Sequence, residues 1–169
     1  MKKNCRVLFI LFFLFISIKS YAIELTNEFM YGTWETKISL NNEQCSTLLG
    51  QGEVTFQIFC NIKDITVYNR NNIATSDGKI NIKIVENNQV IVDETMRYTA
   101  TTKWTIFPES NEILETLNDS DNWFISSPNE KVPVLREFTI TRKVIIIDQN
   151  TIETSDIGYG LKGVSKRIL

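Results

Sequence analysis

The carboxylates are the residues of this chain whose types and spacing could do chemistry. The 169-residue sequence contains no histidine, which excludes Ser-His-Asp triads, Cys-His pairs and His-based zinc or haem sites. Three acidic clusters stand out: Asp93–Glu94, Glu112 with Glu115, and Asp119 with Asp121. Glycoside hydrolysis needs two carboxylates at a defined separation across a cleft, which closeness in sequence does not supply. We therefore expect a protein that is not an enzyme and holds no metal or cofactor, with carboxylate catalysis as the remaining enzymatic alternative.

The N-terminus has the pattern of a secretory signal peptide over residues 1–22. A basic start (Lys2, Lys3, Arg6) precedes an apolar run from Val7 to Ile18, and Ser20-Tyr21-Ala22 places small residues at the two positions that a signal peptidase reads. A membrane-spanning helix needs about 20 apolar residues, more than this run contains. We expect cleavage after Ala22, leaving one domain over residues 23–169 in the periplasm or outside the cell.

Charge and cysteine content both fit an exported protein. Of 18 basic and 20 acidic residues, four basic ones belong to the N-terminal segment, so the mature chain would carry a net charge of −6. This sign disfavours nucleic acid and anionic lipid as partners. Two cysteines would remain, Cys45 and Cys60, and an even pair in an oxidising compartment predicts a disulfide.

Alternation of apolar and polar residues dominates the rest of the chain and predicts half-buried strands. The longest run places Met96, Tyr98, Ala100, Thr102, Trp104 and Ile106 on one face. The predicted strands are Thr33–Leu40, Gly52–Cys60, Asp64–Tyr68, Lys79–Ile84, Met96–Ile106, Glu112–Asn118, Arg136–Thr141, Lys143–Ile147, Thr151–Thr154 and Leu161–Ile168. No helical periodicity of any length follows the N-terminal segment.

Turn-forming residues separate these strands. The predicted turns lie at Ser76-Asp77-Gly78, Asn87-Asn88, Pro108–Asn111 and Asp148–Asn150. The segment Asp119–Pro133 breaks the alternation and is rich in Asn, Asp, Ser and Pro, which predicts a long loop. Strands of this number and spacing favour an all-β, up-and-down antiparallel barrel of about eight strands.

The first strand carries Gly32-Thr33-Trp34, a Gly-x-Trp motif that resembles the start of the lipocalins and the wider calycin superfamily. This resemblance implies that Trp34 closes one end of the barrel, with a basic side chain of the last strand, Arg167 or else Lys166, lying across it. Small exported bacterial lipocalin-like proteins are similar in layout, with an Asp-Gly hairpin, here Asp77-Gly78, and a mid-chain strand containing a tryptophan, here Trp104.

An outer-membrane barrel is an alternative that alternation does not distinguish. It is disfavoured because the chain ends without a terminal aromatic residue and because several predicted strands are shorter than the roughly 9–11 residues that a membrane span needs. We therefore expect no stable membrane insertion.

Aromatic residues give the remaining candidates for a functional site. Trp34, Phe56, Tyr98 and Trp104 are predicted to face the barrel interior, which either is filled by side chains or holds one small apolar ligand. Trp123 and Phe124 lie in the long polar loop, as a lid or as an exposed contact for a protein partner. We expect a non-enzymatic binding protein for a small apolar ligand. The alternative is a periplasmic inhibitor or immunity-type protein that blocks a protein partner.

Overall fold

The computed structural model describes residues 23–48, 56–117, 123–127, 130–133, 138–158 and 160–168. The predicted signal peptide, Asp119 and Asp121 lie outside these ranges. The described part contains two short helices, α2 (Asn27–Met30) and α3 (Asn42–Leu48), and one sheet. Its strands are β1 (Gly32–Leu40), β2 (Gln57–Tyr68), β3 (Ile73–Glu86), β4 (Gln89–Phe107), β5 (Glu112–Leu117), β6 (Trp123–Ser127), β7 (Glu130–Pro133), β8 (Phe138–Asp148), β9 (Thr151–Asp156) and β10 (Lys162–Ile168).

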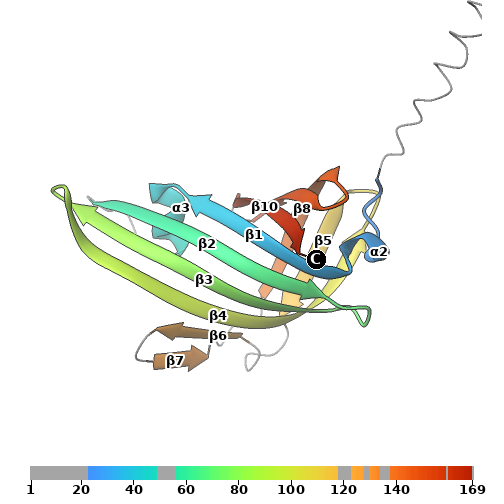
Figure 1. Ribbon diagram of the computed structural model, residues 1–169, viewed down its shortest axis with the longest axis horizontal. Helices are drawn as coiled ribbons and strands as arrows, with labels where there is room; N and C mark the ends of the chain where they lie inside the picture. Colours follow the sequence, from blue (N-terminus) through green and yellow to red (C-terminus); the bar gives the residue numbers. More distant parts are fainter. Residues whose placement is uncertain are drawn as a thin grey trace, which may run out of the picture.

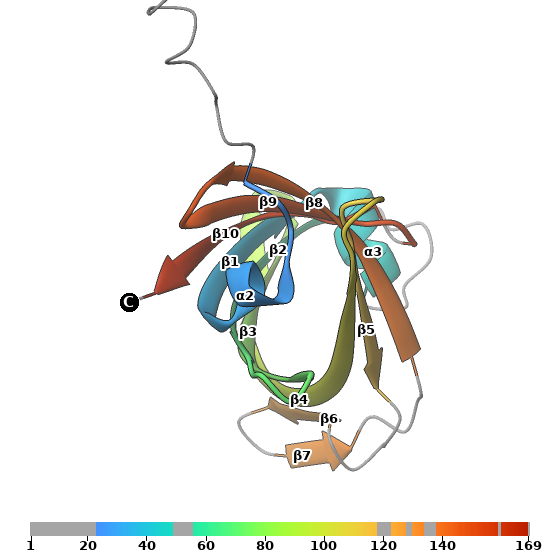
Figure 2. The ribbon, with the colours of Figure 1, turned by 90° about the vertical axis from the view of Figure 1, so that its right-hand side faces the viewer.

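Eight of these strands close into an antiparallel up-and-down barrel, as the sequence predicts. The order β3-β2-β1-β10-β9-β8-β5-β4 returns to its start because β4 also pairs with β3. Figure 2 shows this ring, with β6 and β7 outside it beside β4. Closure removes the edges of the eight-stranded ring, so that β7 is the edge strand of the described sheet.

The two-residue turn between β3 and β4 confirms the prediction at Asn87-Asn88. Both residues have positive φ, 50° and 61°, the backbone of the type I′ turn whose twist matches that of a hairpin. The hairpin is long, and Figure 1 shows its end projecting past α3. The predicted turn at Pro108–Asn111 is also present, between β4 and β5.

The predicted Asp77-Gly78 turn is wrong. Both residues lie in the middle of β3, where Asp77 pairs with Ile65 of β2 and Gly78 pairs with Asp64. Glycine here serves a close approach inside the sheet, because Tyr98 of β4 lies across the Gly78 position. The glycine that suggested a turn is therefore needed inside β3 to make room for the Tyr98 ring.

The segment Asp119–Pro133 contains two short strands and is not one long loop. β6 pairs with β4 from Ala100↔Trp123 to Arg97↔Ser126, and β7 pairs with β6. The two strands form a hairpin that adds two strands to the sheet outside the closed ring. The alternation prediction missed it because both strands are very short.

Helix α2 and the tryptophan of the first strand close one end of the barrel. The Thr26 side chain caps α2 by accepting a hydrogen bond from the Phe29 backbone N–H at 3.1 Å. The indole N–H of Trp34 donates to the Met30 carbonyl at 2.8 Å, which satisfies a carbonyl at the helix end. Trp34 and Met30 are each only 1% exposed.

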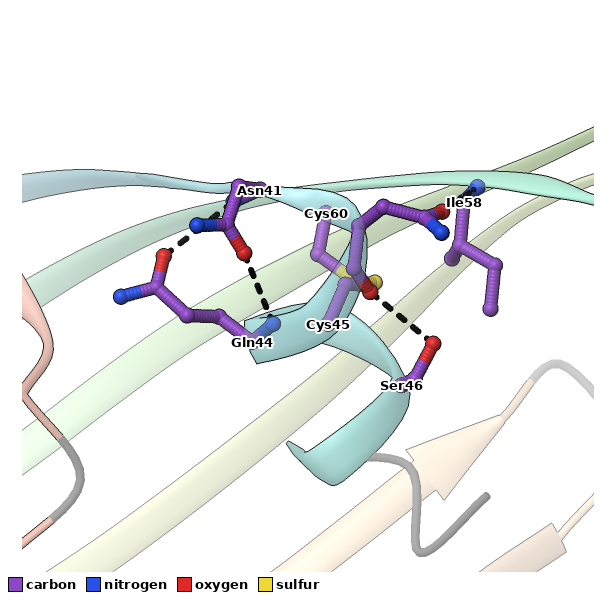
Figure 3. The surroundings of a disulfide bond; sticks show 7 residues. Asn41, Gln44, Cys45, Ser46, Ile58 and Cys60 are labelled. Carbon is purple, nitrogen blue, oxygen red and sulfur yellow. Dashed lines mark hydrogen bonds between the residues drawn. A yellow bond between two sulfur atoms is a disulfide. The ribbon is translucent and has the colours of Figure 1, made fainter. Parts of the chain in front are cut away.

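Helix α3 is held at the other end by the predicted disulfide, Cys45–Cys60, which the structure contains (Figure 3). Asn41 and Gln44 cap the helix reciprocally: Asn41 Oδ1 accepts from the Gln44 N–H at 2.8 Å, and Gln44 Oε1 accepts from the Asn41 N–H at 3.2 Å. Asn42 Oδ1 also accepts from the Ile58 N–H of β2 at 2.6 Å. A loop of this length gains roughly 3 kcal/mol from cross-linking in the chain-entropy model.

Candidate functional site

The barrel interior has two apolar ends and a polar middle. Beside α2 lies a buried cluster of Leu25, Met30, Trp34, Tyr68, Ala74, Trp104, Ile113, Val144 and Ile152. Beside α3 lies a second cluster of Leu40, Cys45, Ile58, Cys60, Ile62 and Ile82. Along β2, the inward-facing residues pass from Ile62 through Asp64 and Thr66 to Tyr68. The same order holds on β1, where Thr36 lies between Trp34 and the second cluster, so a polar layer crosses the barrel.

An ion pair forms one side of this polar layer. Arg142 Nη2 lies 3.0 Å from Glu115 Oε2, and the Tyr68 hydroxyl donates to Glu115 Oε1 at 2.5 Å. The Glu115 side chain is 6% exposed, whereas the Arg142 side chain is 25% exposed. A buried carboxylate needs such partners because the loss of hydration is costly. The Arg142 side chain is therefore partly accessible, in contrast to that of Glu115.

Asp64 forms the other side of the layer and has only neutral partners. Its carboxylate accepts from Thr66 Oγ1 at 2.5 Å and from the Tyr98 hydroxyl at 3.0 Å. Thr66 Oγ1 also lies 2.9 Å from Ser76 Oγ. Asp64 is 6% exposed, and no Lys or Arg of the described chain forms a salt bridge with it. Its charge is therefore offset by hydroxyl groups and by the more distant Arg142.

Gly78 is the residue that lets Tyr98 reach Asp64. It faces inward on β3, directly between Asp64 of β2 and Tyr98 of β4 in register. A Cβ atom at Gly78 would overlap the phenol ring of Tyr98 at Cζ. Only a glycine leaves room for the phenol ring to lie over this strand and place its hydroxyl against the carboxylate of the strand beyond.

Burial shifts the ionisation of these groups. Burial raises the pKa of the Asp64 carboxyl above its usual value, although the hydroxyl of Thr66 and the charge of Arg142 oppose the shift. Burial, together with the nearby carboxylates, also raises the pKa values of the Tyr98 and Tyr68 hydroxyls. The charge of Glu115 raises the pKa of Arg142. At neutral pH the tyrosines are therefore hydrogen-bond donors and the guanidinium is charged.

Several inward-facing side chains of β3 and β4 are only partly buried. The partly buried side chains on this inner face are Ile80 and Ile84 of β3 and Met96, Tyr98 and Ala100 of β4. In contrast, Trp34 and Trp104 are each 1% exposed. The interior face of β3 and β4 is therefore partly accessible, whereas at the α2 end Ile106 and Ile146 are partly buried around a fully buried centre.

The four aromatic residues predicted to bind a ligand are divided between the two ends. Trp34 and Trp104 belong to the cluster beside α2, where Trp104 contacts the rings of Tyr68 and Tyr31 edge-on at centroid distances of 5.2 and 6.0 Å. Phe56 and Tyr98 pack against the cluster beside α3. Of the four, Tyr98 also enters the polar layer.

The expected basic residue across Trp34 is Arg167. The two residues are paired in register on β10 and β1, and the guanidinium carbon lies 4.7 Å from the centre of the Trp34 ring. Arg167 also donates to the Phe29 carbonyl of α2. Lys166, the neighbouring residue, is exposed because its side chain lies on the outer face of β10.

The second predicted binding pair, Trp123 and Phe124, lies at the start of β6. The backbone of β6 runs beside β4, with Trp123 opposite Ala100 and Phe124 opposite Thr99. Their side chains are outside the described part of the structure, so their contact role stays a prediction.

Sequence reasoning missed Asp64 and Arg142 and assigned Glu115 to a different group. Glu112 and Glu115 differ by an odd number of positions on β5, so only Glu115 faces inward and the two cannot form a catalytic pair. Asp64 could have been found from the sequence, because it interrupts an apolar series of alternate residues. Ile58, Cys60 and Ile62 precede it on the same face of β2.

The described residues contain no group of three or more His, Cys, Asp or Glu side chains placed to hold a metal ion. Within the same residues, no helix is long and apolar enough to cross a membrane. No protein-family model matches the sequence, and no curated protein is significantly similar to it.

Proposed function

We propose that this chain is an exported, non-enzymatic binding protein of lipocalin type that holds a small amphipathic ligand inside its barrel. The observation that carries this proposal is the group of partly exposed, inward-facing side chains on β3 and β4 beside the buried polar layer. The apolar part of the ligand would contact Ile80, Ile84 and Met96. Its polar part would meet Tyr98 and the exposed part of Arg142.

This ligand differs from the purely apolar molecule that the sequence predicts. An entirely apolar ligand would strip water from the Arg142 guanidinium and from Asp64 without replacing its hydrogen bonds, which costs free energy. A polar group on the ligand removes that penalty. The lipocalin assignment is supported by Arg167 across Trp34. Export is supported by the N-terminal sequence pattern and by the Cys45–Cys60 disulfide.

Native mass spectrometry of protein exported and purified under mild conditions tests the proposal. We expect an additional mass of a few hundred daltons that is lost on denaturation. Met96→Trp should fill the interior and abolish this mass. Thr95→Trp, one residue away on the exposed outer face of β4, should retain it. A ligand-free mass for the natural chain, with no amphipathic compound changing its tryptophan fluorescence, would refute the proposal.

The alternative function, blocking a protein partner, has support from the β6–β7 hairpin. This hairpin stands outside the closed ring beside β4 and carries Trp123 and Phe124 (Figure 2). Aromatic side chains on such a projecting element are common anchors of protein interfaces. A Trp123→Ala variant that retains every partner recovered with the natural chain would exclude this role.

A further inference from the structure

A row of cationic side chains crosses the outer face of the barrel. The strands β1, β2, β3 and β4 lie side by side in this order (Figure 1), and one cation of each strand is directly opposite the next in register. The members of this basic row, all exposed, are Lys37, Lys63, Lys79 and Arg97. Neighbouring strands are about 4.8 Å apart, so the basic row is about 14 Å long.

The basic row is unfavourable for the fold, because like charges directly opposite each other on a sheet are destabilising. Glu35 offsets part of the repulsion, since its carboxylate lies 3.0 Å from Nζ of Lys37 and 2.5 Å from Nζ of Lys63. Within the described part of the chain, Lys79 forms no salt bridge. Solubility does not require these cations, because the chain already has a negative net charge. An arrangement that costs stability without improving solubility points to a binding role.

A second row, of amide and hydroxyl groups, runs beside the basic row. Its members lie two residues away on each strand and are Ser39, Asn61, Asn81 and Thr95, all exposed and in register. Oδ1 of Asn61 accepts from the Ser39 hydroxyl, and Oδ1 of Asn81 accepts from the Thr95 hydroxyl, each at 2.9 Å. These bonds leave the two side-chain Nδ2 groups as donors for the oxygens of an anion.

The positive charge is confined to a strip, because carboxylates lie on both sides of it. The row on the far side of the cations contains Glu35 and Asp77, and beyond the amide row Lys83 is paired with Asp93. A planar anionic membrane would meet these carboxylates together with the cations. A partner about 10 Å wide, the diameter of one α-helix, would cover only the two rows.

The spacing of the cations matches an α-helix better than an extended strand. Carboxylates three or four positions apart lie on one face of a helix and recur about every 5.4 Å along its axis. Side chains on one face of a strand recur about every 6.7 Å. Over the three intervals of the basic row, the helix departs from the cation positions by about 2 Å and the strand by about 6 Å.

We infer that the outer face of β1–β4 binds an acidic helix of a protein partner, which lies across the strands with one carboxylate per turn on the basic row. Asn61 and Asn81 would donate to the second oxygens of these carboxylates. At physiological ionic strength, charges more than about 8 Å apart are largely screened, so the basic row governs this contact and the net charge of the chain does not. The surface lies on the opposite face of the strands from the barrel interior and is therefore separate from the proposed ligand site.

Fluorescence anisotropy with two labelled helical peptides of identical composition tests this inference. The first peptide carries one glutamate per turn on a single face, and the second carries the same glutamates distributed around the helix. The natural chain should bind the first about fivefold or more tightly than the second, and added salt should weaken this binding. Lys63→Glu/Lys79→Glu should lower the affinity for the first peptide by about tenfold or more, because like charges then face each other.

Lys143→Glu/Lys162→Glu provides the matched control, with the same change in net charge on exposed positions of β8 and β10 outside the basic row. This variant should bind the first peptide as the natural chain does, and circular dichroism confirms the folding of both variants. No binding of the first peptide, equal affinity for the two peptides, or an equal loss in both variants would each overturn the inference. Cosedimentation with phosphatidylglycerol vesicles in place of peptide binding would also overturn it and assign the basic row to a membrane.

Discussion

The two halves of the barrel interior are built from the same strands, and more of the side chains packed against the cluster beside α3 are partly exposed than at the α2 end. Beside α2, the side chains of Trp34, Trp104 and Ile113 are each 1% exposed. The indole N–H of Trp34 donates a hydrogen bond to the Met30 carbonyl of the helix, and the Arg167 guanidinium lies over the indole ring. Towards α3, Ile80, Ile84 and Met96 face inward yet remain partly exposed. The polar layer of Asp64 and Glu115 lies between these regions.

Under the proposed function, this difference would separate the residues that stabilise the fold from those that bind the ligand. A fully packed end contributes most to the free energy of folding, because burial and close contact both scale with area removed from water. An end with partly exposed apolar side chains contributes less to that free energy, and under the proposed function it is the end that would hold the ligand. Substitutions in the two regions should therefore have different consequences, which four measurements examine in order of decreasing effect.

Trp34→Ala should have the largest effect. Removing a fully buried indole loses its packing, its bond to the Met30 carbonyl and the surface on which Arg167 lies, so the free energy of unfolding should fall by about 3–5 kcal/mol. Urea denaturation measures this change. Phe107→Ala is the control, because Phe107 is 45% exposed and should change stability little. Equal losses of unfolding free energy in the two variants would contradict the expected difference between the buried end beside α2 and the exposed surface.

Arg142→Met should destabilise the protein by about 3 kcal/mol at neutral pH, because it leaves Glu115 buried without a counter-charge. Urea denaturation of the variant and of the natural chain measures this loss. A variant as stable as the natural chain would contradict the assigned role of Arg142 as the counter-charge of Glu115.

Gly78→Ala should cost about 1–3 kcal/mol, because the new methyl group displaces the Tyr98 ring from Asp64. The cost should shrink in a Tyr98→Ala background, which isolates the ring as the cause. Gly158→Ala is the matched control, since its Cβ would meet only Asp156 Oδ1 at an ordinary 3.4 Å. Additive effects of the Gly78 and Tyr98 substitutions would rule out this explanation.

Asp64→Asn should have the smallest effect and the opposite sign at neutral pH. Because burial raises the pKa of Asp64, the folded chain binds this proton more tightly than the unfolded chain does. The stability from this group is fully present below the unfolded pKa and is lost as the pH rises through the folded value. The asparagine variant should lose this part of the pH dependence and be slightly more stable at neutral pH. An unchanged pH profile would exclude the charge of Asp64 as its source.

The sequence predicted the barrel and its inward face well, because alternation with period two reports directly which side of a strand is buried. All six residues predicted to share the inner face of Met96–Ile106 do so, and Arg167 lies across Trp34 as the resemblance implies. The Asp77-Gly78 turn failed because glycine serves both tight turns and close approaches within a sheet. Local sequence does not distinguish the two.

The chain by itself determined most strands of the ring, the inner face of Met96–Ile106 and the pairing of Cys45 with Cys60, since these follow from local alternation and from the two cysteines that lie outside the N-terminal segment. Only the tertiary structure decided that Asp64, Tyr98, Glu115 and Arg142 form one polar layer. These residues come from four strands that are far apart in sequence. Strand register and barrel closure bring them together, and neither can be read from one strand alone.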